Sequence, residues 1–195
     1  WKRFSGSATY MLNCGLGIVM VLALDVLTLF KREFLTDYLG QISAIFPTLT
    51  EYLPMLVVVG VGMICGMNVV STPSVSLEGK NLWILRSLPV SGREVLSAKL
   101  QLHLLLNLPA AVVSVFLLGR CLKLSITSIL MAAAYSVSLV WTTGAFGLIL
   151  GLLRPNFTWT TEAMPIKQSL NVLIVMLVGW ILPLLSAGVC WLRRG

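Results

Sequence analysis

The fold is decided by residues 71–94, which read STPSVSLEGKNLWILRSLPVSGRE and join two long apolar runs. Thr72 and Pro73 have the form of a helix cap followed by proline at the first helical position, and Pro89 is a natural stop. Between them, apolar and charged residues recur at helical spacing. The stretch therefore predicts an amphipathic helix at the water boundary of a membrane, within a connector region over 71–91.

Outward from this connector the chain is dominated by apolar residues, which make up 57% of its 195 residues, while only 11% are charged. A helix rises about 1.5 Å per residue, so about 20 residues cross a hydrocarbon core of about 30 Å. The apolar runs lack strand-like alternation, and this favours helices. We predict an all-α fold, a polytopic transmembrane helix bundle of about five to six spans with interfacial amphipathic helices. The runs lie near residues 8–30, 49–70, 100–119, 124–153 and 170–192.

The net charge of +7 comes mostly from Lys and Arg pairs at the ends of apolar runs. Such residues meet lipid headgroups. No basic stripe is interleaved with aromatic residues, and this argues against nucleic-acid binding. The cysteines are scattered without a C-x-x-C pair, so neither a disulfide framework nor a metal site is predicted. They are Cys14, Cys65, Cys121 and Cys190.

Several local signals divide the chain further. Apolar residues recur on one helical face over 33–47, which predicts a helix lying in the membrane interface. Capping-box patterns at Thr48–Glu51 and Ser91–Glu94 predict helix starts. Pro183 is expected to interrupt the last run.

Orientation follows from the basic residues. With the amino terminus in the cytoplasm, the inner segments hold eight Lys and Arg residues against six in the outer ones. We therefore expect a multi-pass protein of the plasma membrane with both polar connectors, 71–91 and 154–169, on the cytoplasmic side. The chain begins with Trp1, and we expect residues 1–195 to be a single transmembrane domain from a longer protein.

Four polar residues inside the runs are candidates for a translocation path. Lys99, His103 and Asn107 are spaced four residues apart, so they share one helical face. Asp25 lies in the first run. Charged residues at membrane depth face protein or water. The simpler interpretation, which we prefer, is that Lys99 reaches the interface, that His103 and Asn107 bond neighbouring helices, and that Asp25 has a basic partner. The sole histidine belongs to no catalytic arrangement, so no catalytic residue is assigned.

The connector resembles the ABC-2-type permease subunits of bacterial ATP-binding-cassette exporters. The residues that carry the resemblance run from Ser76 to Ser91, SLEGKNLWILRSLPVS, and continue to Ala98-Lys99-Leu100. Weaker echoes are Phe4-x-x-Ser7-x-x-Tyr10-x-x-Asn13-x-x-x-Gly17 and Phe157-x-Trp159-x-x-Glu162-x-x-Pro165-x-Lys167-Gln168-Ser169. That family has six spans in each bundle, and five runs are visible here.

The resemblance implies that a cytoplasmic coupling helix docks on a separate ABC ATPase subunit and that a second permease bundle completes a homodimer or pseudo-dimer. ATP and Mg²⁺ would then bind the partner subunit, with no cofactor in this chain. The sequence contains no G-x-x-x-x-G-K-[ST] pattern, so we expect this chain not to be an enzyme. The residues implied to contact the ATPase are Leu77, Glu78, Lys80, Asn81, Trp83 and Arg86.

Three alternatives stay open. The connector helix would simply float at the interface if it had no partner. An ion- or proton-coupled carrier would use Asp25 instead of ATP. A polytopic membrane enzyme or scaffold is the third, and it would need clustered acids, histidines or cysteines, whereas the seven acids of this chain are spread out.

Overall fold

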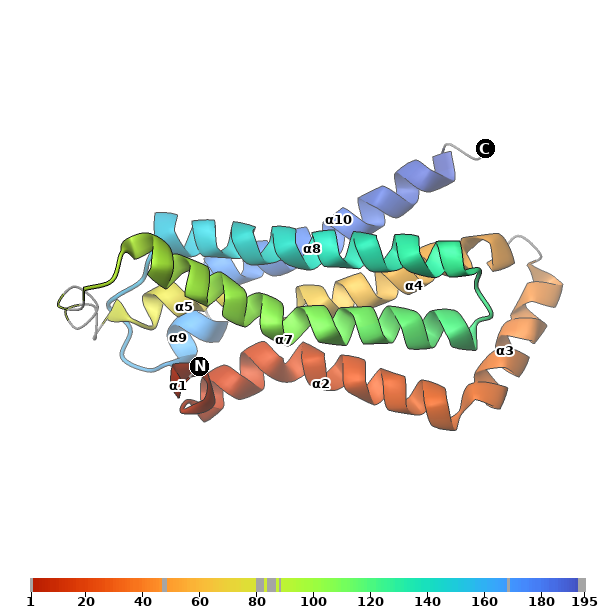
Figure 1. Ribbon diagram of the computed structural model, residues 1–195, viewed down its shortest axis with the longest axis horizontal. Helices are drawn as coiled ribbons and strands as arrows, with labels where there is room; N and C mark the ends of the chain where they lie inside the picture. The colour runs from red at the N-terminus through yellow and green to blue at the C-terminus, as the bar shows by residue number, and fades with distance from the viewer. Residues whose placement is uncertain are drawn as a thin grey trace.

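The computed structural model describes residues 2–46, 49–79, 83, 87, 89–167 and 169–192. Long helices lie side by side, and shorter ones gather at the two ends of the bundle (Figure 1). The described residues contain no β-strand, and the predicted all-α class is confirmed. In chain order the helices are α1 (Lys2–Ser5), α2 (Ala8–Phe30), α3 (Arg32–Ile45), α4 (Leu49–Gly66), α5 (Ser71–Ser76), α7 (Gly92–Cys121), α8 (Ile126–Leu153), α9 (Ala163–Lys167) and α10 (Leu170–Leu192).

Five helical segments among the described residues are long and apolar enough to cross a membrane. The five runs expected from the sequence are thereby confirmed as helices. One segment combines α4 with α5, and another combines α9 with α10. The segments are Ala8–Phe30, Glu51–Ser76, Gly92–Cys121, Ile126–Leu153 and Ala163–Val189.

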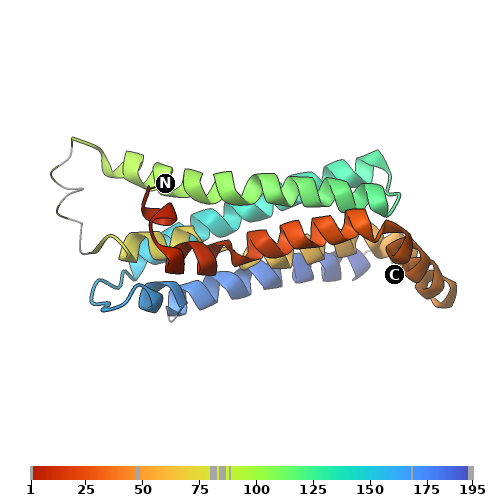
Figure 2. The same ribbon diagram turned by 90° about the horizontal axis from the view of Figure 1, so that it is seen from below.

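The two ends of the bundle differ. Helices α1, α5 and α9 lie together at the end that carries the amino terminus, and α3 lies across the other end (Figures 1 and 2). The described parts of both polar connectors thus lie at the same end, and their cytoplasmic placement stays a prediction. The helix expected over 33–47 is α3, and none of its residues is buried in the bundle. Its placement in a membrane interface stays a prediction.

Serine side chains fix where the long helices begin. Ser91 and Glu94 form the predicted capping box of α7, because the Ser91 N–H donates to the Glu94 carboxylate at 2.7 Å and the Glu94 N–H donates to Ser91 Oγ at 3.3 Å. Ser7 caps α2 and Ser125 caps α8 without a capping box: their hydroxyl oxygens accept from the N–H groups of Tyr10 and Ser128. The capping box expected at Thr48 includes residues outside the described part of the chain.

The second apolar run is broken, which corrects the expectation of one helix over 49–70. Helix α4 ends at Gly66, residues 67–70 are not helical, and α5 begins at Ser71. A break of this kind leaves backbone groups without helical partners, which is costly inside a bilayer. Hydropathy does not reveal it, because Met67, Val69 and Val70 within the break are apolar and continue the apolar run of α4.

Helix α2 supplies the partners that the break requires. The Tyr10 hydroxyl donates to the Val70 carbonyl at 2.5 Å, and the Cys14 thiol donates to the Val69 carbonyl at 3.5 Å. The carbonyl oxygen of the Asn68 side chain accepts from the Ile18 N–H at 3.1 Å. Gly17 allows this close approach, since a Cβ there would lie 2.5 Å from Asn68 Oδ1.

The prediction that Thr72 caps the start of an amphipathic helix is wrong. Helix α5 spans only Ser71–Ser76, it follows Val70 in a helical conformation, and no side chain caps it. Five of its six residues are buried, so α5 packs inside the bundle. It lies against α8, because its short hydroxyl side chains fit closely between helices.

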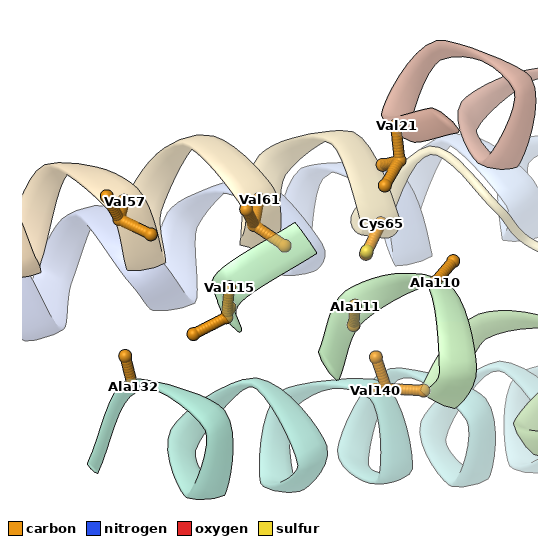
Figure 3. Close-up of a cluster of buried hydrophobic side chains, with 9 residues drawn as sticks. All are labelled: Val21, Val57, Val61, Cys65, Ala110, Ala111, Val115, Ala132 and Val140. Carbon is orange, nitrogen blue, oxygen red and sulfur yellow. The ribbon is translucent and has the colours of Figure 1, made fainter. Parts of the chain in front are cut away.

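The centre of the bundle is built from small side chains. Figure 3 shows valines, alanines and a cysteine from α2, α4, α7 and α8 pointing toward one another. Small residues let membrane helices pack closely where hydrophobicity alone does not drive them together. The cluster consists of Val21, Val57, Val61, Cys65, Ala110, Ala111, Val115, Ala132 and Val140.

Helices α4 and α10 cross at a glycine contact. A Cβ on Gly66 would lie 3.1 Å from the Gly179 backbone, so the two main chains nearly touch. The Trp180 indole N–H donates to the Met63 carbonyl at 2.9 Å beside the crossing. Helix α10 then continues through Pro183 to Leu192, and the interruption expected at that proline is therefore not observed.

Candidate functional site

The candidate site is the junction where the first connector leaves α5. Two carbonyl groups at the end of this short helix accept bonds from distant parts of the chain. Lys99 of α7 donates to the Ser74 carbonyl at 2.8 Å, and the Trp159 indole N–H donates to the Ser76 carbonyl at 2.7 Å. The last carbonyls of a helix have no helical partner, so these side chains complete the end of α5. They also tie it to both neighbouring segments.

Lys99 makes a second contact in the junction. Its ammonium group lies 2.6 Å from the Glu78 carboxylate, and both side chains are mostly shielded from solvent. The capping box at Ser91 starts α7 two turns earlier, and this sets the position from which Lys99 reaches α5. The ion pair and the Ser74 bond together lock the first connector to α7.

The second connector closes over the first. The Asn156 N–H donates to the Ser76 hydroxyl at 3.0 Å, beside the Trp159 bond. A Cβ on Gly79 would lie 2.6 Å from the Phe157 ring, so only glycine leaves room for this contact. Trp159 is buried in an apolar cluster. Its other buried members are Phe4, Tyr10, Cys14, Val70, Leu77 and Ile166.

The amino terminus joins the same junction. The Ser7 hydroxyl, which caps α2, donates to the Glu162 carboxylate just before α9. Three segments far apart in the sequence therefore meet at one end of the bundle. The two weak sequence echoes around Phe4–Gly17 and Phe157–Ser169 include residues of these segments.

The residues predicted to contact an ATPase have different environments. Leu77 is 2% exposed and packs in the Trp159 cluster, which corrects its placement on a docking face. Glu78 is engaged by Lys99. Trp83 is 69% exposed and available to a partner. The remaining three, Lys80, Asn81 and Arg86, lie outside the described residues.

The candidate path residues divide into two places. His103 and Asn107 are buried in α7, with the Asn107 amide donating to the His103 carbonyl at 2.9 Å. Asp25 is buried beside α7, where it accepts from the Ser114 hydroxyl at 2.8 Å instead of from the expected basic partner. Ser114 follows His103 by eleven residues, or about 16 Å of helix. Asp25 is thus separate from the polar stripe.

Sequence reasoning missed the surface on which α5 rests. The side chains of Ser71 and Thr72 face Gly147 of α8, and the ring of His103 faces Gly144 one turn away. A third glycine, Gly151, faces the Thr72 backbone. The spacing of these glycines, three and then four residues apart, places them on one face of α8 and is the signal that would have revealed it.

The described residues bring no three His, Cys, Asp or Glu side chains together in a group that fits a metal ion. The chemistry of the junction is therefore that of hydrogen bonds, one ion pair and apolar packing. These contacts connect the end of α5 to α7 and to the second connector, and the second connector to the amino-terminal segment.

We predict that the Lys99–Glu78 pair stabilises the junction. Lys99→Met should lower the free energy of unfolding by about 1–3 kcal/mol, since it leaves the Glu78 carboxylate and the Ser74 carbonyl without this donor. Lys99→Met with Glu78→Gln should recover part of the loss. Thermal unfolding in detergent of both variants measures the coupling, and Lys31→Met, which removes an exposed charge, is the control. Equal losses in the single and double variants would contradict the pairing.

Comparison of the chain with curated proteins and with solved structures returned no match. One family model does match, over residues 69–181. The matched segment begins in the break before α5, takes in α7, α8 and α9, and extends into α10. It includes Lys99, Trp159 and the three glycines of α8, and it covers more than half of the chain. The chain therefore belongs to the family described as "Putative ATP-binding cassette".

Proposed function

We propose that this chain is the membrane-spanning permease subunit of an ATP-driven exporter, powered by a separate ATPase subunit. The observation that carries the proposal is the junction at one end of the bundle, where the first connector is fixed to α7 by Lys99 and to the second connector by Trp159. Five membrane-length helices support a membrane-spanning role, and the family membership supports a relation to ATP-binding-cassette systems.

The family description names ATP binding, and we assign that activity to a partner polypeptide. A P-loop needs a strand, a glycine-rich turn and a helix, with Lys and Ser or Thr after the second glycine. The described residues of the segment matched by the family form helices and no strand, and the Gly79-Lys80 pair is followed by asparagine. ATP and Mg²⁺ would bind the ATPase subunit, and this chain would convert its movement into rearrangement of the helices.

The geometry suggests a route for that movement. A load applied to the first connector passes through Glu78 and Lys99 into α7, and through Ser76 and Trp159 into the segment that leads to α10. Two such bundles, each with an ATPase, would alternate between inward- and outward-facing packings. The junction would lie on the cytoplasmic side of the plasma membrane, where the ATPase has access to ATP.

We predict that Trp83 contributes to ATPase docking. Trp83→Ala combined with Arg86→Ala should reduce co-purification of a P-loop ATPase from mild detergent by at least about tenfold, because Trp and Arg are frequent anchors of interfaces and Trp83 is exposed. The matched control is Trp141→Ala with Arg120→Ala, since both residues are exposed on long helices away from the connectors. Unchanged co-purification and unchanged stimulation of ATP hydrolysis in the first variant would refute the docking role.

A proton-coupled carrier is the second candidate, favoured by the buried carboxyl of Asp25 and its bond from Ser114. A carboxyl group in a bundle core is a natural proton acceptor. Transport that persists without ATP, collapses with the proton gradient and disappears in Asp25→Asn would favour this carrier over the exporter.

A further inference from the structure

The polar side chains between α5 and α8 lack the partners that buried groups normally have. Ser71 is fully buried, and Thr72 and His103 are each 2% exposed. The two hydroxyl oxygens have no hydrogen-bond partner, and the imidazole of His103 has no partner other than the Val140 backbone. Asn68 Nδ2 and Asn107 Oδ1, on the flanking segments, are also without partners.

These groups point at one surface. A Cβ on Gly147 would lie 2.3 Å from Thr72 Oγ1 and 2.9 Å from Ser71 Oγ. A Cβ on Gly144 would lie 2.5 Å from the His103 ring. The side chains therefore rest on bare backbone of α8, and we name this contact the α5–α8 seam.

Packing alone does not explain this choice of residues. A buried polar group without a partner is destabilising, and here several such groups lie close together. Alanine or valine in place of Ser71 and Thr72 would avoid this destabilisation. Such groups have an explanation if another molecule forms hydrogen bonds with them in a different conformation of the protein.

We propose that the α5–α8 seam is a binding site for uncharged hydrogen-bonding groups, such as hydroxyls or amides. The seam opens when α5 moves off α8, and water then enters it from the junction end of the bundle. Hydroxyl, amide and imidazole side chains offer both donors and acceptors. The side chains of the seam include no Asp, Glu, Lys or Arg. Glu78, which follows α5, is paired with Lys99 of α7, and Arg154 is exposed beyond the end of α8. The seam thus presents no net charge to hold an ion.

Helix α5 is a short segment whose two ends allow it to move as one rigid unit in the proposed opening. It has six residues and follows a non-helical segment at 67–70, and its far end is held by Lys99 and Trp159. The contacts that fix α5 are those on which the proposed ATPase would act. The inference rests on the proposed function for what drives the movement, whereas the polarity of the seam is a property of this chain alone.

The test is labelling of cysteine by a charged, membrane-impermeant maleimide added at the junction side of vesicles that contain the full chain, with and without its ATPase. Ser71→Cys and Thr72→Cys should react at least about tenfold faster than Val115→Cys, which is equally buried in the apolar core. Thr158→Cys on the exposed connector marks full access. The wild-type chain gives the background from its own cysteines.

The ligand class has its own measurement. Submicellar octyl glucoside, with an uncharged hydroxyl head, should slow labelling of Thr72→Cys more than octyl sulfate or octyltrimethylammonium of the same chain length. Equal protection by all three would overturn the assignment to uncharged groups.

Two outcomes separate this inference from the proposed function. Labelling of both seam variants at the Val115→Cys rate, with and without ATPase and nucleotide, would overturn the seam. Rapid labelling that never responds to ATPase or nucleotide would support the seam and count against the exporter.

Discussion

Gly151→Ala should destabilise the protein, although alanine normally favours a helix over glycine. The added Cβ would lie 2.5 Å from the Thr72 carbonyl oxygen, which belongs to the backbone of α5. Overpacking of this kind costs about 1–3 kcal/mol, and the helix gains only about 1 kcal/mol from losing glycine. The backbone of α5 has to shift, because a carbonyl cannot rotate away as a side chain does.

The loss of stability should appear as a fall in Tm of about 2–4 °C for each kcal/mol, measured by thermal unfolding in detergent. Gly60→Ala is the matched control, because no atom lies within 4 Å of the added Cβ in α4. It should leave Tm unchanged or raise it slightly. A Gly151→Ala variant as stable as Gly60→Ala would show that α5 does not rest on α8.

Trp159→Ala should have the larger effect on the junction. The indole is 6% exposed, packs with Tyr10, Leu77 and Ile166, and holds the Ser76 carbonyl. Truncation of a buried Trp costs about 3–5 kcal/mol. Trp159→Phe keeps much of the packing and loses the hydrogen bond, so it should cost about 1–3 kcal/mol.

Limited proteolysis of the purified chain provides the readout at the site itself. Both connectors should become much more sensitive to cleavage in Trp159→Ala, and moderately so in Trp159→Phe. Trp141→Ala is the control, since this indole is 53% exposed on α8 and its loss leaves the junction intact. Cleavage rates that match the control would mean that Trp159 does not hold the connectors together.

The features that sequence predicted best depend on local chemistry. Apolar length determined the five membrane-length helices, and a serine followed three residues later by glutamate located the start of α7 at Ser91. The number of spans between the two connectors predicted that both lie on the same side, because each crossing reverses the side of the membrane.

The features that sequence missed depend on contacts between distant residues. Residues 71–76 are rich in Ser and Thr, which usually indicates a solvent-exposed segment at the membrane surface. Five of these six residues are nevertheless buried, because glycines of α8 lie opposite them. Trp159 and Ser76 are separated by 83 residues, and no periodicity links them. The break at 67–70 is invisible to hydropathy, since its partners Tyr10 and Cys14 belong to another helix.

The break in the second span also dictates an order of assembly during synthesis. Tyr10 and Cys14 leave the ribosome before Val69 and Val70, so the hydroxyl and the thiol are already in place when those carbonyls enter the bilayer. Trp159 follows much later, and until then the Ser76 carbonyl lacks its indole donor. The end of α5 can therefore gain its indole donor only after the residues of α8 have been synthesised.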